Sequence, residues 1–586
     1  MKPLESKNLN GLWAQLMVEE LVRNEVTTFY IGPGSRSTPL TVAVARHARA
    51  RAQICYDERG AGFRALGHAR ATRLPAAVIT TSGTAVANLY PAVVEAAQDH
   101  VPLILLTADR PPELIDTGAN QAILQTQMFA RYVRWQFELP CPCAHVGPGF
   151  VLTTVDQAVY QSLAPNAGPV HLNCMFREPF LDPDGEGGGY DLSTLTQWVN
   201  RTHPWTRYAR TVSHLEDADL TRIVECVNDT QKGMLFVGRL DSARQRQAVM
   251  LLMTRLDWPV YADIASGLRF EAGTHVLRYF DQDQISNACN SACRAQTVLH
   301  IGGRITSKRV PLFLAANPPE NYIVVKEHSS RYDPVHCVTQ SLECDFMRFV
   351  IQLGERCKDN VDAVYRDTLR QQATHIDSLI GEMIQAEPAL TEPYVARQVT
   401  RLIPENQALF ISNSMPIRDV DIYGIGQRDP IHVGVNRGAS GIDGILASAV
   451  GFAEGQSQPT TVLLGDVALL HDLNSLSMIR QCNHPLCIVV INNQGCGIFH
   501  FLPIARESDV FEDYFVTPHR FTFAGLGSTF QLDYVCAENK DAFTSAYCQF
   551  LASKRPMLIE VPTNSEESFR FRKKMKQAIL NLLNGL

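Results

Sequence analysis

An aspartate and an asparagine, 27 residues apart, have the types and the spacing of a metal–phosphate site. Asp466 follows the short apolar run 462–464 and a glycine, and Asn493 follows a second apolar, β-branched run, 485–491. With a free carbonyl from the 494–495 turn, the carboxylate and the amide would offer about three hard oxygens and leave the rest of an octahedron to phosphate and water, as Mg²⁺ prefers. Each residue alone is typical of a helix N-cap or a turn. The two together favour the metal site.

The elements that must position this pair form a strand–helix–strand unit. Between the two apolar runs, apolar residues recur at helical spacing across 469–480. A unit of this length is a parallel crossover, so both strands end at the same edge of the sheet, where open α/β sheets bind ligands. We therefore expect Asp466 and Asn493 to be neighbours. Gly465 and Gly495 would let the backbone approach a phosphate closely.

The first third of the chain predicts a sheet of the same kind. Strands and helices alternate in it, after an opening amphipathic helix at 13–22, which indicates a doubly wound α/β domain with a parallel sheet. The expected strands are 27–32, 53–56, 76–81 and 103–107, and the expected helices are 39–48, 60–71 and 85–97.

The loops that follow these strands carry polar groups. Ser35 and Ser37 are good helix N-caps, and a hydroxyl in the tight turn 81–84 would cap the next helix. Capping does not explain Arg36, which would complete an anion site beside the free N–H groups of a helix N-terminus. Glu58 lies in the first turn of a helix, where an acidic residue by itself only complements the helix dipole.

The remainder predicts two further α/β domains, so that the chain has three doubly wound parallel-sheet domains at 1–183, 200–355 and 375–586. The Gly-rich tract 182–189 is typical of a linker. The basic amphipathic helix expected at 569–586 is better explained by docking on its own domain than by a membrane surface. The strands expected here are 233–237, 259–264, 297–301, 322–325, 408–411, 431–435 and 556–561, and the helices are 243–256, 359–387 and 394–402.

Composition excludes several classes of protein. The chain has 586 residues, 45% of them hydrophobic and 19% charged, as in soluble globular proteins of several domains. A net charge of −7 gives no indication of bulk nucleic-acid or membrane-surface binding. We see no signal-peptide pattern and no run that could span a membrane. The 15 cysteines form no CxxC pair, so we expect a reduced, cytoplasmic protein, with Cys496 as a small space-filling residue.

Long strings in the chain resemble one family of thiamine-diphosphate enzymes. The Gly-Asp … Asn-Asn pair resembles the thiamine-diphosphate signature, although Val467 stands where that signature often has glycine. Five ungapped strings resemble the pyrimidine-binding domain of the menaquinone-pathway SEPHCHC (2-succinyl-5-enolpyruvyl-6-hydroxy-3-cyclohexene-1-carboxylate) synthase family, and the resemblance covers nearly the whole chain. The strings are PGSRSTPL, DERGAGFRALG, TSGTAVANLYPAVVEA, LTADRPPEL and GANQAI.

The resemblance implies a reaction and a set of cofactors. The family decarboxylates 2-oxoglutarate and adds the succinyl group to isochorismate by conjugate addition, with thiamine diphosphate and Mg²⁺ or Mn²⁺. Glu58 would hydrogen-bond the aminopyrimidine ring nitrogen and promote the imino tautomer, which then generates the reactive ylid. The pyrimidine end is bound by one subunit and the diphosphate end by another, which implies a homodimer or a dimer of dimers.

The resemblance also assigns site residues. Glu58, Arg418 and Arg437 would be catalytic, and Asp466, Asn493 and the Gly495 carbonyl would hold the metal. Besides Glu58 and the metal ligands, the cofactor-binding set is Ser414, Ile442, Gly465 and Ile498, with Ile442 as the apolar wedge between the cofactor rings. The substrate-binding set is Ser35, Arg36, Arg110, Asn120, Gln121, Lys308, Arg309, Arg418, Arg437, Phe499 and Leu502.

The charges favour this family over its relatives. Both substrates are dicarboxylates, and four carboxylates need several cationic partners in a site that excludes water. The site set contains six such residues, a surplus for pyruvate alone. Two alternatives stay open: another thiamine-diphosphate enzyme, such as an acetohydroxyacid synthase or a 2-oxoacid decarboxylase, and a non-catalytic nucleotide-binding or regulatory protein on the same scaffold.

Overall fold

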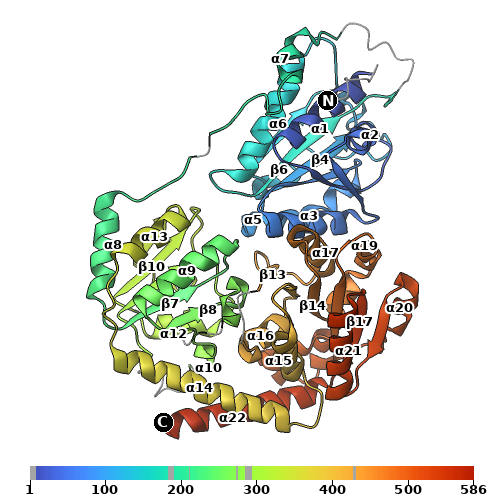
Figure 1. The fold of residues 1–586 in the computed structure, drawn as a ribbon. Coiled ribbons are helices and arrows are strands. Elements are labelled where there is room, and N and C mark those ends of the chain that lie inside the picture. The colour runs from blue at the N-terminus through green and yellow to red at the C-terminus, as the bar shows by residue number, and fades with distance from the viewer. Residues whose placement is uncertain are drawn as a thin grey trace. The chain divides into compact units, whose positions relative to one another are not determined.

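The computed structural model describes residues 8–181, 190–209, 211–271, 273, 275–283, 293–426 and 431–585. The chain divides into two compact units. Figure 1 colours the ribbon by residue number. The first unit contains Met1–Thr211, Asn436–Ser457 and His471–His484, and the second contains Val212–Val435, Gln458–Leu470 and Pro485–Leu586. The expected linker 182–189 lies outside the described residues.

Three parallel sheets form the framework and confirm the predicted fold class. The first, in order, is β2 (Arg51–Ile54), β1 (Thr28–Ile31), β3 (Ala76–Thr80), β4 (Leu103–Asp109), β6 (Pro169–Met175) and β5 (Trp135–Leu139). The central sheet is β11 (Gln340–Glu343), β10 (Asn321–Lys326), β9 (Thr297–Ile301), β7 (Gly233–Val237) and β8 (Val260–Ala262). The last is β13 (Val433–Val435), β12 (Ala408–Ile411), β14 (Thr460–Gly465), β15 (Leu486–Asn492), β17 (Met557–Pro562) and β16 (Asp533–Cys536).

Each sheet lies within one of the three predicted domains, although the two compact units divide the chain differently. The predicted boundaries at 1–183, 200–355 and 375–586 therefore stay a prediction. No helix among the described residues is long and apolar enough to cross a membrane.

Helices cover both faces of the first sheet (Figure 1). On one face, Trp13, Phe29 and Leu106 belong to a single buried cluster, because successive side chains of a strand point to opposite faces and the helices fill one of them. The helices of this face are α1 (Leu9–Arg23), α2 (Thr38–Arg46) and α6 (Pro148–Leu163), and the other face carries α3 (Glu58–Thr72) and α5 (Tyr90–Gln98).

A helix from the C-terminal third completes the first unit. α17 (Ile445–Gln456) packs parallel to α3, and glycines set the distance between the two helices. A Cβ added at Gly67 would lie 1.9 Å from the Ser448 carbonyl oxygen, and one at Gly451 would lie 1.9 Å from the Arg64 carbonyl oxygen. Only residues without a side chain allow so close an approach.

The central sheet of the second unit is covered on both faces. The buried cluster of one face includes residues of α8 (Asp217–Asp229), α9 (Ala243–Leu256) and α13 (Phe346–Arg356), and that of the other includes residues of α10 (Phe280–Asp283), α12 (Arg309–Ala316) and α14 (Ala363–Ala386). The last sheet packs against α15 (Glu392–Leu402), α16 (Met415–Tyr423) and α21 (Lys540–Ser553).

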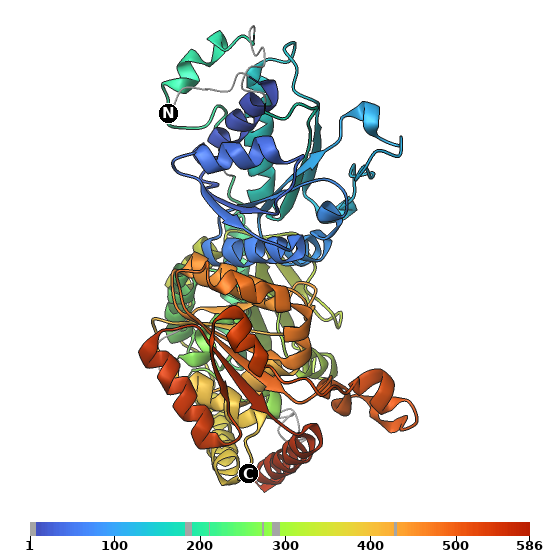
Figure 2. The same cartoon turned by 90° about the vertical axis from the view of Figure 1, so that its right-hand side faces the viewer.

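The C-terminal helix α22 (Ser565–Gly585) lies beside α14, as Figures 1 and 2 both show. Phe571, Met575 and Ile579 are buried against Ile380 of α14 and Tyr423 of α16. The predicted docking of this helix on its own domain is confirmed.

Two of the predicted helices are broken. The helix expected at 85–97 is α4 (Thr84–Ala87) followed by α5, because Pro91 cannot donate to the preceding turn and starts a new helix. The helix expected at 469–480 is α18 (Asp466–His471), a 3₁₀ turn and α19 (Leu476–Ile479). The buried Asp472 carboxylate accepts hydrogen bonds from the Ser475 hydroxyl at 2.7 Å and the Ala447 N–H at 2.9 Å, which fixes this break.

The predicted hydroxyl caps are also wrong. Ser37 precedes α2, but its hydroxyl donates to the Gly34 carbonyl at 3.0 Å instead of capping the helix. Ser35 is exposed, and its carbonyl accepts the Thr38 N–H. In the turn 81–84 the N-cap residue is Gly83, which has no side chain to offer.

Candidate active site

The predicted metal–phosphate pair lies at neighbouring strand ends. β14 and β15 are paired in parallel with Gly465 opposite Ile491, so Asp466 and Asn493 follow adjacent strands at one edge. Asp466 is 2% exposed, and the Gly495 N–H donates to its Oδ2 at 3.0 Å. The expected adjacency is confirmed, and the metal assignment stays a prediction.

The donor set at this edge fits a divalent ion that also binds phosphate. Burial raises the pKa of Asp466, and the hydrogen bond from the Val467 N–H opposes that rise. The Asn493 amide lies next to Gly497, where an added Cβ would come within 2.5 Å of its nitrogen, whereas a Cβ at Gly465 would meet nothing within 4 Å. The described residues contain no cluster of three His, Cys, Asp or Glu side chains suited to a metal. Besides the Asp466 carboxylate, an ion here would therefore depend on amide, carbonyl and phosphate oxygens.

A segment that sequence reasoning left unassigned, 503–530, folds back over this edge. The Cys496 N–H donates to the Val516 carbonyl at 2.7 Å, and the His519 N–H donates to the Gln494 carbonyl at 3.1 Å. His519 Nε2 then lies 3.1 Å from Asp466 Oδ2. No pattern in the sequence marks this histidine, because the contact depends on a loop that returns from 53 residues further along the chain.

Glu58 lies at the carboxyl edge of the first sheet. It is the first residue of α3, and Asp57 before it caps the helix by accepting the Arg59 and Gly60 N–H groups at 2.8 and 3.2 Å. Because Asp57 performs the capping, the Glu58 carboxyl is available for another partner. It is half-buried against Gly32, where an added Cβ would lie 2.9 Å from Glu58 Cγ.

The loop that carries the predicted wedge begins at the same end of α3. Gly444 has a φ of 64° and precedes α17, and a Cβ there would lie 1.9 Å from the ring of Phe63, in the second turn of α3. Ile442 is two residues before Gly444 and is half-buried. The packing of α17 on α3 thus brings the Ile442 loop to the end of the helix that carries Glu58.

Two buried arginines lie at the edge of the first sheet. Arg36 is 6% exposed and Arg110 is 7% exposed. Arg36 donates to the Phe176 carbonyl at 2.9 Å and to Glu178 at 3.3 Å, but its buried Nε has no partner. Burial lowers the pKa of Arg36, and the charge of Arg110 lowers it further. Two guanidinium groups this close are stabilised by a bound anion.

The neighbouring loops converge on these arginines. Arg110 donates to the Ser82 hydroxyl, and Gly83 beside it donates its N–H to Gln125 at 3.0 Å. A Cβ added at Gly83 would lie 3.4 Å from the Cβ of Gln121. Asn120 and Gln121 are both exposed, so their amides are accessible to a ligand.

The other predicted cations fall in both units. In the second unit Lys308 is exposed, Arg309 lies 3.5 Å from Asp281, and Arg418 donates to the carbonyl of Ser414. In the first unit Arg437 is half-buried and is followed by two residues whose N–H groups donate to the Glu95 carboxylate, at 2.8 and 2.6 Å.

The predicted apolar wall forms a 3₁₀ turn over residues Gly497–Phe501. Ile498 and Phe499 are half-buried, Leu502 is 40% exposed, and the Phe499 ring packs edge-on against Phe515 at 5.5 Å. Exposed apolar side chains beside a polar site are typical of a ligand-binding surface.

Comparison with known proteins places this arrangement in a family. Three family profiles match successive parts of the chain: "Thiamine pyrophosphate enzyme, N-terminal TPP binding domain" at 13–128, "Middle domain of thiamine pyrophosphate" at 190–411, and "Thiamine pyrophosphate enzyme, C-terminal TPP binding domain" at 428–561. Relatives named 2-succinyl-5-enolpyruvyl-6-hydroxy-3-cyclohexene-1-carboxylate synthase occur in several bacteria. The one from Rubrobacter xylanophilus is 44% identical over 97% of this chain and 98% of its own. Those from Salinibacter ruber and Chlorobaculum tepidum are 44% and 40% identical, over 96% and 98% of this chain and 95% and 98% of theirs.

The chain belongs to the SEPHCHC synthase family. It is therefore a thiamine-diphosphate enzyme. The two profiles named as TPP binding domains match stretches that contain strands of the first and of the last sheet. The resemblance inferred from the sequence strings is confirmed. The non-catalytic alternative is set aside, since the chain matches synthases over nearly its full length.

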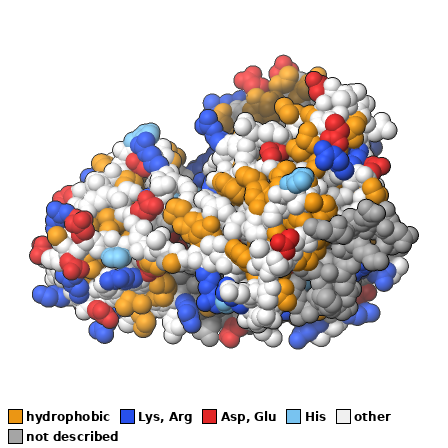
Figure 3. All heavy atoms as spheres, turned by 90° about the horizontal axis from the view of Figure 1, so that it is seen from above, with side chains coloured by type: hydrophobic (Ala, Val, Ile, Leu, Met, Phe, Trp, Pro, Cys, Tyr) orange, Lys and Arg blue, Asp and Glu red, His pale blue; other side chains and the backbone are white. Residues whose placement is uncertain are grey.

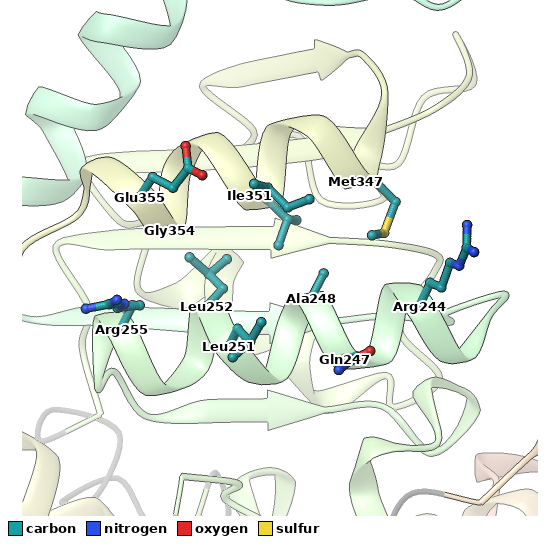
Figure 4. A pocket seen from close by; sticks show the side chains of 11 residues that line it. Arg244, Gln247, Ala248, Leu251, Leu252, Arg255, Met347, Ile351, Gly354 and Glu355 are labelled. Carbon is teal, nitrogen blue, oxygen red and sulfur yellow. The ribbon is translucent and has the colours of Figure 1, made fainter.

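A groove in the central domain of this synthase-family chain lies away from the carboxyl ends of the strands. The groove, of about 510 Å³, runs between α9 and α13, with Leu251, Leu252 and Ile351 along it and Arg244 and Arg255 at its two ends (Figure 4). It lies on the helical face of the central sheet and contains none of the predicted site residues.

On the face drawn in Figure 3, basic and acidic side chains of the described residues are interspersed. Nucleic-acid-binding proteins instead gather Lys and Arg into one patch or stripe.

Proposed function

We propose that this protein decarboxylates 2-oxoglutarate and adds the resulting succinyl group to isochorismate, which gives 2-succinyl-5-enolpyruvyl-6-hydroxy-3-cyclohexene-1-carboxylate in menaquinone biosynthesis. One observation carries the proposal: synthases of that name match the chain over nearly all of its length. The chemistry of the two sheet edges supports it, since one edge offers buried cations and the other offers hard oxygen ligands.

Thiamine diphosphate, when bound, supplies a nucleophilic carbon for 2-oxo acids and accepts the electron pair left by CO₂. Toward that group, Glu58 would hold a proton at the aminopyrimidine ring nitrogen, and Ile442 would support the bend between the rings. Ser414 and Ile498 would line the cofactor, and Gly465 would leave room for its diphosphate, as the absence of any atom within 4 Å of an added Cβ allows.

The metal would be Mg²⁺ or Mn²⁺, held by the Asp466 carboxylate, the Asn493 amide and the Gly495 carbonyl. The Gly495 N–H already donates to Asp466, so the loop and the strand end form one rigid unit. His519 is a further neighbour of Asp466 and restricts the orientation of its carboxylate.

The six cations would bind the four carboxylates of the two substrates. Arg36 and Arg110 favour a bound anion because they lie close together in a buried site and Arg36 Nε is unpaired. Ser35, Asn120 and Gln121 add hydrogen-bonding groups to the same edge. Lys308, Arg309, Arg418 and Arg437 would orient the remaining carboxylates and offset charge that develops during the reaction.

Phe499 and Leu502 would exclude water from the reacting atoms on the apolar side of the site. The site would be completed by a second copy of the chain in a homodimer or a dimer of dimers, as the family resemblance implies. In such an assembly Glu58 of one subunit and Asp466 of the other act on one cofactor.

The test is to incubate the purified protein with thiamine diphosphate and Mg²⁺, first with 2-oxoglutarate alone and then with isochorismate added. We expect slow CO₂ release in the first step and a new tricarboxylic product by mass spectrometry in the second. CO₂ release from pyruvate but not from 2-oxoglutarate would instead show a different 2-oxoacid enzyme.

A further inference from the structure

Buried carboxylates lie under the loop that carries Lys308 and Arg309. Asp263 directly follows β8 and is fully buried. Its Oδ2 accepts the Thr306 N–H at 2.5 Å, and its Oδ1 accepts the Thr306 hydroxyl at 3.2 Å and the Ala265 N–H at 2.9 Å. Both oxygens are therefore used to fix the position of Thr306.

A second carboxylate holds the other end of the same loop. Asp281 on α10 is 3% exposed, and its Oδ2 lies 3.5 Å from both the Ser307 hydroxyl and Arg309 Nη1. The same guanidinium nitrogen donates to the Asp281 backbone carbonyl at 3.3 Å. At 3.5 Å the attraction is more electrostatic than directional. The Arg309 side chain is still 38% exposed, so its remaining N–H groups can reach a ligand.

The end of β8 is also hydrogen-bonded to α16, the helix that contains Arg418. Tyr261, two residues before Asp263, donates to Asp421 Oδ2 on α16 at 3.3 Å. Arg269 donates to the backbone carbonyl of Asp421. The loop of Arg309 and the helix of Arg418 are thus positioned from one strand end.

The carboxyl groups of this cluster influence one another. Burial raises the pKa of Asp421 to about 7, Arg269 opposes the rise, and the charges of Asp263 and Asp281 add to it. Asp421 Oδ1 is buried and has no partner. Because Asp263 and Asp281 are buried, water and salt screen their charges less than those of surface carboxylates.

We propose that Asp263 and Asp281 are positioning residues, which hold the segment 306–309 so that Lys308 and Arg309 together bind one substrate carboxylate. The inference rests on the proposed function, since it takes that function's assignment of Lys308 and Arg309 to substrate binding. The exposed Lys308 precedes α12, an eight-residue helix whose N-terminus adds to the positive field. Neither aspartate touches the substrate; both act through the loop.

Asp281→Asn and Asp263→Asn keep the shape of each side chain and remove its charge. We expect each variant to raise the KM of one of the two dicarboxylates by about tenfold or more while kcat stays within about twofold, because the cations lose their alignment but the reacting atoms do not. Hydrogen exchange of the 302–309 peptide should become faster. Thermal unfolding identifies a variant that fails to fold, and Ser307→Ala then removes one contact of Asp281 without changing a buried charge.

Asp257→Asn is the matched control. Asp257 belongs to the same domain, is half-buried and pairs with Arg366 at 2.5 Å and Arg370 at 2.7 Å. It lies before β8, at the opposite end of the strand from Asp263. This substitution breaks comparable ion pairs, so we expect a lower melting temperature with both KM values unchanged.

A double-mutant cycle separates a positioning role from a general structural one. If Asp281 acts through Arg309, then Asp281→Asn should add nothing to the KM defect of Arg309→Ala, and Asp281→Glu should restore most of the affinity. If Arg309→Ala raises KM but Asp281→Asn leaves it unchanged or lowers it, the positioning role is wrong. Additive effects of the two substitutions, or a loss in kcat alone, overturn it as well.

Alanine substitutions of Lys308 and Arg309 test separately whether these two residues bind substrate. If Lys308→Ala and Arg309→Ala both leave the two KM values unchanged while the wild-type protein makes the product, the cation site of the proposed function is wrong and the positioning role falls with it. If the wild-type protein makes no product, the proposed reaction fails before the aspartates are tested.

Discussion

The first and last sheets have the same architecture and opposite chemistry. Each has six parallel strands in the order second, first, third, fourth, sixth, fifth. The carboxyl edge of the first sheet carries the buried arginines 36 and 110 together with Glu58, whereas the edge of the last carries Asp466 and Asn493. The shared strand order decides where a ligand can bind, and the loops decide the sign of the charge that binds there.

The two edges also differ in how their charges are compensated. At the first edge, Arg36 keeps an unpaired buried nitrogen beside a second guanidinium group, so it can still donate a hydrogen bond to an anion. At the last edge, the buried Asp466 receives N–H groups from Val467 and Gly495. The first edge is therefore suited to organic anions and the last to a cation that carries phosphate.

The largest expected effect comes from Glu58, at the edge that also carries Arg36 and Arg110. Glu58→Gln should lower kcat by about 10²- to 10⁴-fold, because the amide cannot exchange a proton with the aminopyrimidine ring. Thiamine diphosphate affinity, measured by fluorescence titration, should stay within a few-fold. Near-normal turnover in this variant would remove Glu58 from the chemistry, and Glu58→Asp should lose less than Glu58→Gln.

The second prediction concerns the oxygen-rich edge. Asp466→Ala should weaken Mg²⁺-dependent binding of thiamine diphosphate by about 10- to 100-fold, since the ion loses its only charged protein ligand. Asp513→Ala, which removes an exposed carboxylate from the segment that covers this edge, is the control and should bind normally. Equal affinity in wild type and Asp466→Ala would refute the metal assignment.

A smaller effect should separate geometry from charge at the cationic edge. Arg110→Lys keeps the charge but loses the planar fork that suits a carboxylate, so the KM of one dicarboxylate should rise by about tenfold. Arg177→Lys changes an exposed arginine that pairs with Glu113, and surface pairs of this kind contribute little. Steady-state kinetics of both variants should show a difference. The same KM for both would mean that Arg110 is only structural.

The smallest effect tests the packing that brings the Ile442 loop to α3. Gly67→Ala forces a methyl group against the Ser448 carbonyl and should cost about 1–3 kcal/mol of unfolding free energy. Gly354→Ala is the control in the other unit, because its Cβ would meet only Leu252 at 3.8 Å and alanine favours the helix. Denaturant unfolding measures the free energy of both variants. An unchanged unfolding free energy in Gly67→Ala would show that α17 and α3 do not pack in this way.

Much of the fold could be predicted from the sequence, because in the first and last sheets apolar strands alternate with helices whose apolar residues recur at regular spacing. The strand at 408–411 was predicted with its observed bounds, and the strand–helix–strand argument correctly placed Asp466 beside the end of β15. The edge strands β5 and β16 were missed. They are only partly buried and carry no continuous apolar run.

The parts of the site that depend on distant contacts could not be predicted. Pro91 is a local signal of a helix break that the periodicity argument overlooked, whereas the break at Asp472 also depends on the distant Ala447 N–H. Two further contacts join residues far apart in the chain. His519 contacts Asp466, and Asp281 forms an ion pair with Arg309. Only the resemblance, and not spacing, indicated the roles of Glu58 and Ile442.

In the proposed assembly the two edges serve one cofactor from two chains, and mixed dimers distinguish this arrangement from a site built within one chain. At a thiamine diphosphate concentration that saturates the wild type but not Asp466→Ala, we expect Glu58→Gln and Asp466→Ala each to have little activity alone. After co-expression about half of the dimers are mixed, and each mixed dimer has both residues intact at one of its two sites. The activity of the preparation should therefore return to about a quarter of the wild-type value. Activity that stays at the level of the single variants, in dimers shown to contain both chains, would contradict the claim.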